Sequence, residues 1–330
     1  MGIRGNLFAR LLTQNPYAEL VAFSEINSQV SEKASRTWKV KAYSRFEDML
    51  EKEDLDAVII TTPDFAHYKP VMRSLERGLH IMVEKPFTQS LEEAETMFKK
   101  SIEVGSKCLV AFENRWNPAV VQAKNQIERG EIGNILTFNG LLSNQVFVPT
   151  QMLSWASRST CGWFLLSHLL DLVYFLSGKF PESVYATGSK RFLKSLGVDT
   201  YDYIHVVVKY KDGSDGIFES VWCLPNSFPN VFDFKLSIYG DKGFLHINSA
   251  HQMLDLAAGS YRYPSSLVVD YGHKLIGFPG FMLDDFIDSI RLDREPLASF
   301  KDGLLNTRLL AAVHRSLESG KEEVIMGGDS

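Results

Sequence analysis

A lysine at the end of a short apolar segment is the first candidate for chemistry. Lys85 follows the segment 80–83 (HIMV) and Glu84, and Pro86 comes next. If 80–83 is a strand of a parallel sheet, Lys85 lies at its carboxyl end, where open α/β sheets bind ligands. A cation there stabilises the negative charge that develops on an alcohol oxygen during oxidation. We predict that Lys85 is catalytic and binds substrate; a solvated surface lysine is the competing interpretation.

A histidine is the second candidate, as the group that accepts or returns the hydroxyl proton. His168 lies in the apolar segment 162–176, where a histidine is otherwise a buried structural residue. Asp171 follows one helical turn later, so its carboxylate can orient the imidazole and favour its protonated form. We predict catalytic roles for both residues and a substrate contact for His168. Arg158, in the polar segment 154–160, is predicted to reach a substrate hydroxyl.

The first residues contain glycines in a pattern typical of dinucleotide sites. Gly2 and Gly5 precede a helix expected over 6–13, so the backbone there can approach a pyrophosphate at the helix N-terminus. Glu25 follows the strand-like segment 19–24 and is predicted to accept hydrogen bonds from the adenosine ribose.

The same residues predict which dinucleotide binds. Glu25 repels a 2′-phosphate and favours NAD, whereas Arg4 in the glycine loop partly offsets this, so NADP is the alternative cofactor. Gly2 and Gly5 match the second and third glycines of the fingerprint, and the first is missing. We expect a preceding strand of about six to ten residues outside this sequence; a degenerate nucleotide site is the other interpretation.

The order of elements predicts an α/β protein with two domains. Short apolar segments such as 56–62, 80–83 and 107–112 alternate with helical segments up to residue 115. This pattern indicates a doubly wound parallel sheet of the Rossmann type, without its first strand, over residues 1–115. Residues 116–330 combine an apolar helix, several alternating strands and two final helices. They predict an α+β domain with a largely antiparallel, open-faced sheet.

Composition narrows the class of protein. The 330 residues are 45% hydrophobic and carry 35 basic and 40 acidic side chains, a net charge of −5. This balance argues against nucleic acid as a partner, and no apolar run reaches the roughly 18 residues that a membrane span needs. The three cysteines have no zinc-like spacing, so we expect no metal site, and their scatter indicates a reducing, cytoplasmic setting.

Several short motifs occur along the chain in a fixed order. They are Thr62-Pro63, His67, Glu84-Lys85-Pro86, 114–118 (NRWNP), 130–133 (GEIG), 168–171 (HLLD), 240–243 (GDKG) and Asp302-Gly303. In these residues the chain resembles the Gfo/Idh/MocA family of NAD(P)-dependent oxidoreductases, and the likeness covers essentially the whole sequence. The resemblance places Thr62, Pro63 and His67 beside the pyrophosphate and the nicotinamide ribose, and Glu84 near that ribose. It also implies a cofactor contact for Asn114.

The resemblance further implies an activity and an assembly. We expect hydride transfer between NAD(P) and a hydroxyl or carbonyl of a sugar, cyclitol or related polyol, in a homodimer or homotetramer formed through the open sheet. Many family members carry a catalytic aspartate four residues before the histidine, where this chain has Phe164. Two alternatives stay open: a non-catalytic sensor of the same fold, and a lyase or glycosidase that reduces and regenerates NAD within one cycle.

Overall fold

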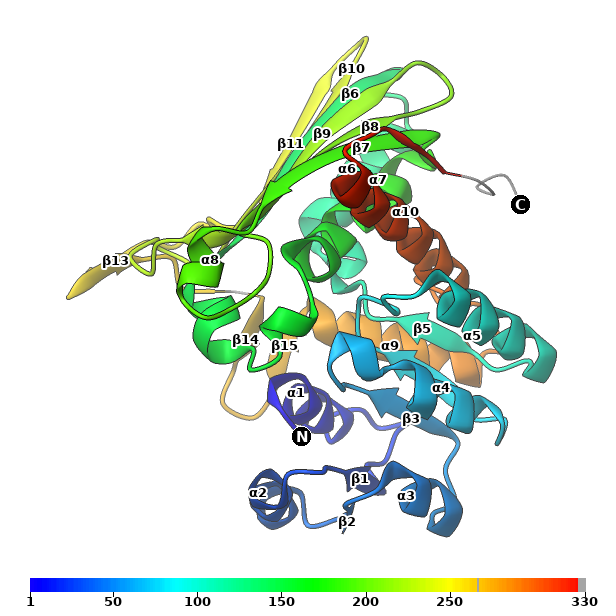
Figure 1. Ribbon diagram of the computed structural model, residues 1–330. Coiled ribbons are helices and arrows are strands. Elements are labelled where there is room, and N and C mark those ends of the chain that lie inside the picture. The colour runs from blue at the N-terminus through cyan, green and yellow to red at the C-terminus, as the bar shows by residue number, and fades with distance from the viewer. Residues whose placement is uncertain (266, 326–330) are drawn as a thin grey trace. The chain divides into compact units, whose positions relative to one another are not determined.

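The computed structural model describes residues 1–265 and 267–325, which form two compact units (Figure 1). The first unit consists of Met1–Glu113 and Leu267–Leu304, and the second of residues 114–265 and 305–325. The sequence predicted a single boundary between 115 and 116. The first unit instead ends two residues earlier and also contains a segment from the last quarter of the chain.

Parallel strands and helices alternate through the N-terminal part of the first unit, as the sequence predicted. The elements are α1 (Ile3–Leu12), β1 (Ala22–Ser24), α2 (Ser28–Trp38), β2 (Lys41–Tyr43), α3 (Phe46–Lys52), β3 (Ala57–Ile60), α4 (Tyr68–Leu75), β4 (His80–Val83), α5 (Leu91–Val104) and β5 (Cys108–Val110). Local sequence sets their ends. The Ser90 hydroxyl caps α5 by accepting from the Glu93 N–H, and Gly105 ends that helix with a left-handed φ of 69°.

Two parallel sheets form in this unit instead of one continuous sheet. β1 pairs with β2, and β3, β4 and β5 pair in that order. Ala57 aligns with His80, and Ile81 with Cys108. No pairing joins β1 to β3 within the described residues.

Residues 267–304 complete the first unit by covering β5 and α1. They form the hairpin of β14 (Val268–Asp270) and β15 (Leu275–Gly277), then α9 (Phe278–Arg291) and the start of α10 (Phe300–Ser319). The N–H of Val110 donates to the Ala298 carbonyl at 2.9 Å. The rings of Phe87 and Phe300 lie 4.5 Å apart. These contacts link residues that are far apart in the sequence, so the segment belongs to the first unit despite its place in the chain.

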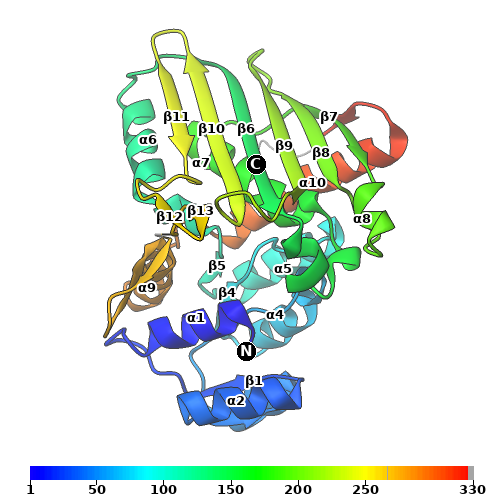
Figure 2. The same cartoon turned by 90° about the vertical axis from the view of Figure 1, so that its left-hand side faces the viewer.

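The second unit consists of one large sheet, several helices and a short hairpin. Its elements are α6 (Pro118–Glu128), β6 (Ile135–Gln145), α7 (Ser167–Ser177), β7 (Ser183–Ser189), α8 (Phe192–Ser195), β8 (Tyr203–Lys209), β9 (Asp215–Leu224), β10 (Phe232–Gly240), β11 (Phe244–Asn248), β12 (Leu256–Ala258), β13 (Ser260–Arg262), the rest of α10, and β16 (Glu323–Val324). The seven-stranded sheet has the order β11-β10-β6-β9-β8-β7-β16, and Figure 2 shows the strands from β11 to β7 side by side. Only the β6–β9 pairing is parallel among them. This confirms the predicted, largely antiparallel second sheet.

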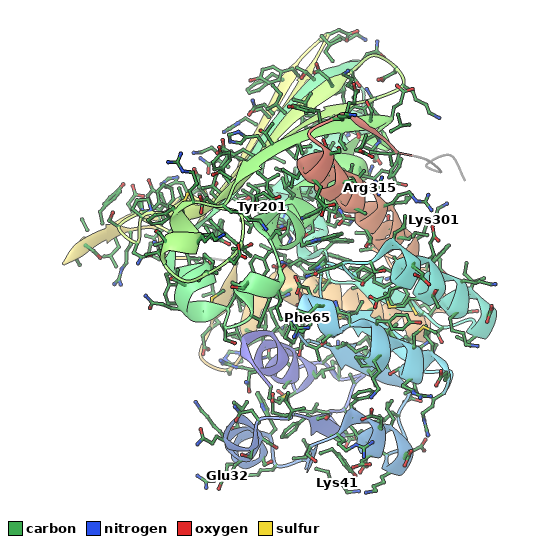
Figure 3. The ribbon with its side chains drawn as sticks, in the orientation of Figure 1. Glu32, Lys41, Phe65, Tyr201, Lys301 and Arg315 are labelled. Carbon is green, nitrogen blue, oxygen red and sulfur yellow. The ribbon has the colours of Figure 1, made fainter. Side chains whose placement is uncertain are left out.

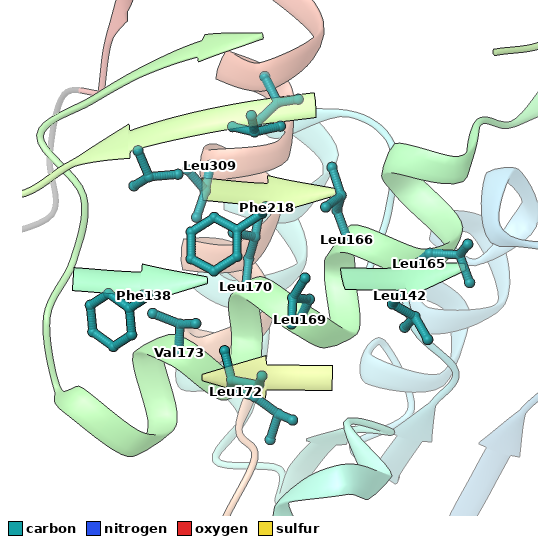
Figure 4. Packing of buried hydrophobic residues seen from close by; sticks show 14 of the residues in the cluster. Phe138, Leu142, Leu165, Leu166, Leu169, Leu170, Leu172, Val173, Phe218 and Leu309 are labelled. Carbon is teal, nitrogen blue, oxygen red and sulfur yellow. The ribbon is translucent and has the colours of Figure 1, made fainter. Parts of the chain in front are cut away.

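The hydrophobic core of the second unit lies between this sheet and the helices on one of its faces (Figure 4). Leu169, Leu172 and Val173 of α7 are at most 1% exposed, and Phe138 and Phe218 meet them from β6 and β9. The alternation along β8, where Ile204, Val206 and Val208 are buried and their neighbours are not, leaves the other sheet face open.

Candidate active site

Lys85 lies where the parallel strand β4 ends, as the sequence predicted. The N–H of Glu84 still donates to the Ile60 carbonyl at 2.9 Å, so strand pairing continues to the residue before Lys85. The Lys85-Pro86 peptide bond is cis. The lysine lies just after β4, at the carboxyl edge of the sheet, which is the usual place for ligands in open α/β folds.

The surroundings of Lys85 make its proton easier to lose. Burial lowers the pKa of the ammonium group from its ordinary value to about 8. The carboxylates of Glu84, Glu113 and Asp64 act in the opposite direction, and the guanidinium of Arg4 adds to the lowering. A lysine with this pKa is mostly charged near neutral pH and can still exchange its proton there.

Arg4 lies in the first turn of α1 and bridges two carboxylates. Its Nε is 2.5 Å from Oε1 of Glu84, and its Nη2 is 2.6 Å from Oε2 of Glu113. The guanidinium also lies over the ring of Phe8, 5.0 Å from its centroid. Although burial disfavours the charged form, Glu113 and Glu84 raise the pKa of Arg4 above its ordinary value. Arg4 was predicted in the glycine loop but is part of the helix, and neither of its carboxylate partners was predicted.

His67 connects the turns that follow β3 and β4. Its Nδ1 lies 2.9 Å from the Pro86 carbonyl oxygen and 3.2 Å from that of Phe87. Its Nε2 lies 3.0 Å from the Thr62 carbonyl oxygen. The side chain is 1% exposed, which differs from the solvent-facing histidine expected when a helix merely begins there. His67 therefore braces the turn that carries Lys85, and its predicted cofactor contact stays a prediction.

Thr62 and Pro63 form the turn at the carboxyl end of β3. The Thr62 hydroxyl donates to the Ala66 carbonyl at 3.2 Å, and the short 3-10 helix η1 (Asp64–Ala66) follows. Phe65 of η1 is labelled in Figure 3. Because β3 and β4 are parallel neighbours, their carboxyl-terminal turns lie at the same sheet edge.

The N-terminus of α1 has the features that a dinucleotide needs. Gly2 is its N-cap residue, no side chain caps the helix, and a Cβ on Gly2 would meet nothing within 4 Å. A Cβ on Gly5 would lie 3.2 Å from Oγ1 of Thr61, so glycine permits close packing of α1 against the end of β3. Uncapped N–H groups and an open approach fit the pyrophosphate of NAD.

Glu25 lies directly after β1, where the ribose-binding carboxylate was predicted. Its side chain accepts a hydrogen bond from the Asn27 N–H at 2.9 Å and another from the amino group of Met1. The Asn27 side chain in turn caps α2. The carboxylate is thus held at the carboxyl end of its strand, as a ribose acceptor must be.

His168 lies in the first turn of α7, in the second unit. The sequence predicted one helix over 162–176; the structure has a π-helical turn η5 (Gly162–Leu166) followed by α7. The Nδ1 of His168 lies 3.3 Å from Nδ2 of Asn114. If the amide donates, Nδ1 accepts and the proton of a neutral imidazole is on Nε2. Asn114, predicted only as a cofactor contact, is therefore also a partner of the histidine.

Asp171 forms a buried ion pair that the sequence analysis did not foresee. Its Oδ2 accepts from Nε of Arg115 at 3.0 Å and its Oδ1 from Nη2 at 2.6 Å. The two side chains are 2% and 3% exposed. The guanidinium also lies over the Phe175 ring, 5.1 Å from its centroid. The predicted orientation of His168 by Asp171 stays a prediction, whereas the pairing with Arg115 is observed.

Two further residues bear on the predicted substrate site. Arg158 ends the 3-10 turn η4 (Ala156–Arg158) and is exposed. Phe164, at the position where many family members carry an acid, packs among aromatic rings, 6.1 Å from Trp155 and 5.6 Å from Trp222. Glu113 and Arg115, which flank Asn114, were not predicted as part of the site. Two charged residues so soon after the apolar strand β5 could have indicated them.

The described residues contain neither a metal-binding cluster nor a membrane-spanning helix. In residues 1–265 and 267–325, no group of three or more His, Cys, Asp or Glu side chains is arranged to hold a metal ion. Over the same residues, every helix is too short or too polar to cross a membrane.

Curated relatives align along nearly the whole chain. The scyllo-inositol 2-dehydrogenase (NAD(+)) of Bacillus subtilis (strain 168) is 27% identical over 316 residues, which are 94% of this chain and 90% of that protein. The glucose-6-phosphate 3-dehydrogenase of the same organism is 25% identical, with 89% of this chain and 87% of that protein covered.

Solved structures share the fold. Myo-inositol 2-dehydrogenase from Lactobacillus plantarum superposes with a TM-score of 0.86 at 20% identity, over 98% of this chain and 97% of the other. Scyllo-inositol dehydrogenase from Lactobacillus casei, with bound cofactor NAD(H) and scyllo-inositol, gives 0.83 at 20% identity, over 99% and 97%.

Family models match both parts of the sequence. The oxidoreductase family model with an NAD-binding Rossmann fold matches residues 1–112. The model of the family's C-terminal alpha/beta domain matches residues 124–326. Together with the lysine turn and the glycine-led helix, these matches show that the chain belongs to the Gfo/Idh/MocA family of NAD-binding oxidoreductases.

Proposed function

We propose that this protein is an NAD-preferring dehydrogenase that acts on a secondary hydroxyl, or the corresponding carbonyl, of a cyclitol, sugar or related polyol. The observation that carries the proposal is Lys85 on the turn after β4, with its pKa lowered to about 8. The names of the relatives, which act on inositols and glucose 6-phosphate, support the substrate class.

Each catalytic side chain has a proposed role. The Lys85 ammonium donates a hydrogen bond to the reacting oxygen and stabilises negative charge as the C–H bond breaks. His168 takes the hydroxyl proton at Nε2, which requires the neutral imidazole to carry its own proton on Nδ1 and to donate it to the side-chain oxygen of Asn114, with that amide turned over. NAD, when bound, supplies the hydride acceptor. In the reverse direction the same groups return the proton to a carbonyl oxygen.

The residues proposed to hold the cofactor lie in the first unit, except Asn114, which is the first residue of the second unit. Gly2 leaves the α1 N-terminus open to the pyrophosphate, Gly5 lets α1 pack close to Thr61, and Glu25 accepts from the adenosine ribose. The remaining proposed contacts are Arg4, Thr62, Pro63, His67, Glu84, Lys85 and Asn114. Arg158, Lys85 and His168 are the proposed substrate contacts.

The direct test follows NADH absorbance with scyllo-inositol, myo-inositol, glucose 6-phosphate and related polyols. We expect turnover of at least one of them, and a loss of kcat of about a hundredfold or more in Lys85→Ala. Lys69→Ala, which removes an exposed lysine paired with Glu47, is the matched control. Equal turnover by wild type and Lys85→Ala removes Lys85 from the mechanism.

A non-catalytic sensor is the second candidate, favoured by Phe164 in place of the usual acid. The Phe164 ring packs against Trp155 and Trp222 and cannot supply the carboxylate that many family members carry at this position. Tight NAD binding by calorimetry, with no product from any substrate, supports the sensor. Product analysis by mass spectrometry also detects a lyase or glycosidase that regenerates its NAD, which net NADH formation misses.

We also infer a homodimer formed through the open face of the seven-stranded sheet. Exposed apolar side chains occur there on several strands: Tyr185, Val207, Ile217, Tyr239 and Phe244. A second copy presents the same face, so its apolar side chains can cover these in a symmetric interface. For localisation we propose the cytoplasm, because Cys108, Cys161 and Cys223 are all free thiols.

A further inference from the structure

Arg4 joins three elements at the sheet edge that carries Lys85. It comes from α1, Glu84 ends the β4 segment, and Glu113 follows β5. Each carboxylate binds a different nitrogen of the guanidinium: Nε lies 2.5 Å from Oε1 of Glu84, and Nη2 lies 2.6 Å from Oε2 of Glu113. The three side chains are 29%, 10% and 17% exposed, so solvent screens these pairs less than it screens ordinary surface pairs.

Lys85 experiences the charges of the same groups. The carboxylates of Glu84, Glu113 and Asp64 attract its ammonium, and the Arg4 guanidinium repels it. Three carboxylates without a second cation would favour the charged lysine strongly. Two of the three are instead bound to Arg4.

We propose that Arg4 is a positioning residue, which holds Glu84 and Glu113 at the ends of β4 and β5 and takes up their charge beside Lys85. The geometry of the ion pairs supports this role, because the planar guanidinium of Arg4 binds both carboxylates and so fixes the distance between them. A residue whose role is to bind a 2′-phosphate would not need these two carboxylates on its guanidinium.

The consequence is a lysine that exchanges protons near neutral pH. With Arg4 in place, burial dominates and the pKa of Lys85 is about 8. Without the guanidinium, the two carboxylates are left to pair with the ammonium, so its pKa rises. In the part that concerns catalysis the inference rests on the proposed function, whereas the charge coupling itself does not.

Competitive acetylation of amines across a pH series, with peptide mass spectrometry, measures the Lys85 pKa in the full-length protein without any substrate. In Arg4→Met we expect that pKa to rise by about one unit, so that Lys85 is labelled about tenfold more slowly near neutral pH. Arg4→Lys keeps a positive charge and is expected to lie closer to wild type. Arg10→Met is the control, because it removes an α1 arginine that pairs with Asp270 instead.

A second variant keeps the inference testable if Arg4→Met does not fold. Glu113→Gln removes one carboxylate and retains Arg4, so we expect the Lys85 pKa to fall. An unchanged or lower Lys85 pKa in folded Arg4→Met overturns the inference, and so does an unchanged or higher pKa in Glu113→Gln.

The pH profile of kcat/KM separates the inference from the proposed function. If Lys85 is catalytic, the part (limb) of the kcat/KM profile that follows Lys85 ionisation moves to higher pH in Arg4→Met. It moves together with the Lys85 pKa measured by acetylation, the labelling pKa. If the labelling pKa moves and the limb does not, the role of Arg4 stands and the catalytic role of Lys85 fails.

Discussion

Arg115 and Asp171 are the residue pair whose separation should cost the second unit most stability. Both are almost fully buried and share two hydrogen bonds, so Arg115→Met leaves a carboxylate without its cation. We expect a loss of about 3–5 kcal/mol in the free energy of unfolding, measured by denaturant titration. Arg129→Met, at an exposed arginine, is the control and should change it by less than about 0.5 kcal/mol. Equal effects of the two variants would contradict the importance of the pair.

His314 predicts a pH-dependent loss of stability. Its Nδ1 contacts the Leu310 carbonyl at 2.7 Å, its Nε2 contacts the Thr160 hydroxyl at 2.8 Å, and its ring stacks on Trp163 at 4.6 Å. Burial lowers the pKa of His314 to about 4. Because the unfolded chain binds this proton at about pH 6.5, stability falls as the pH drops from there towards 4, by up to about 3 kcal/mol.

Thermal or denaturant unfolding between about pH 7 and 4 measures this loss. Carboxylates also titrate in the lower part of the range, so the comparison with His314→Gln isolates the histidine. The variant should be less stable near neutral pH and should lose less stability on acidification. Parallel curves for the two proteins would exclude the histidine as the cause.

At the residue scale, local sequence was enough to propose Lys85 and His168 as reactive groups, but it did not predict the ion pairs of the neighbouring arginines. Lys85 and His168 were recognisable as candidates in the sequence, because one follows a strand-like segment and the other lies in an apolar helical segment. The ion pairs of Arg4 and Arg115 were not, because the carboxylate partners are separated from these arginines by 80 and 56 positions or more. Only the folded chain brings these charges together.

At the scale of elements, two helical glycines of the first unit should respond oppositely to alanine. A Cβ on Gly303 of α10 would lie 2.7 Å from Cγ2 of Val110 and 2.8 Å from Cγ of Phe87, both fully buried. A Cβ on Gly280 of α9 would meet Leu11 at an ordinary 3.5 Å. We expect Gly303→Ala to cost about 1–3 kcal/mol and Gly280→Ala to add up to about 1 kcal/mol.

Denaturant unfolding of both glycine variants tests this contrast. The two substitutions make the same chemical change near the start of a helix, so each serves as the control for the other. Stabilisation by Gly303→Ala, or a matching loss in Gly280→Ala, would contradict the packing described for α9 and α10.

Elements with strong apolar patterns were predicted closely. The strand-like segment 80–83 has the observed bounds of β4, and the segments 56–62 and 107–112 contain β3 and β5. The hairpins β12–β13 and β14–β15 were missed, because their exposed side chains show no apolar alternation. The return of 267–304 to the first unit was missed for another reason. It depends on contacts with α1 and β5 that no local pattern records.

At the scale of the whole molecule, Glu25 should determine the choice between the two nicotinamide dinucleotides. Its carboxylate, held after β1, repels a 2′-phosphate, so calorimetry should give tighter binding of NAD than of NADP. Glu25→Ser removes the repulsion and should narrow the ratio of the two dissociation constants by about tenfold or more. Glu32→Ser, at an exposed carboxylate on α2, is the control. An unchanged ratio in Glu25→Ser would remove Glu25 from the cofactor site.

The proposed dimer has an equally direct test. Ile217 lies on the open face of β9, 54% exposed, between Val207 of β8 and Asn139 of β6. Ile217→Glu places two like charges across a symmetric interface, so sedimentation should show a shift from dimer to monomer. Ile102→Glu, at an exposed side chain on α5, should leave the mass of the sedimenting particle unchanged. A wild-type protein that sediments as a monomer would disprove the proposed interface.

The central claim is that hydride leaves a polyol carbon while Lys85 contacts the reacting oxygen. The most direct measurement uses a polyol substrate deuterated at that carbon, with NAD and the full-length protein, and determines the mass of the recovered nicotinamide cofactor. We predict reduced cofactor that carries one deuterium with wild type and Lys69→Ala, and almost none with Lys85→Ala. Cofactor that binds but returns unreduced and unlabelled, or equal labelling by Lys85→Ala, would contradict the account.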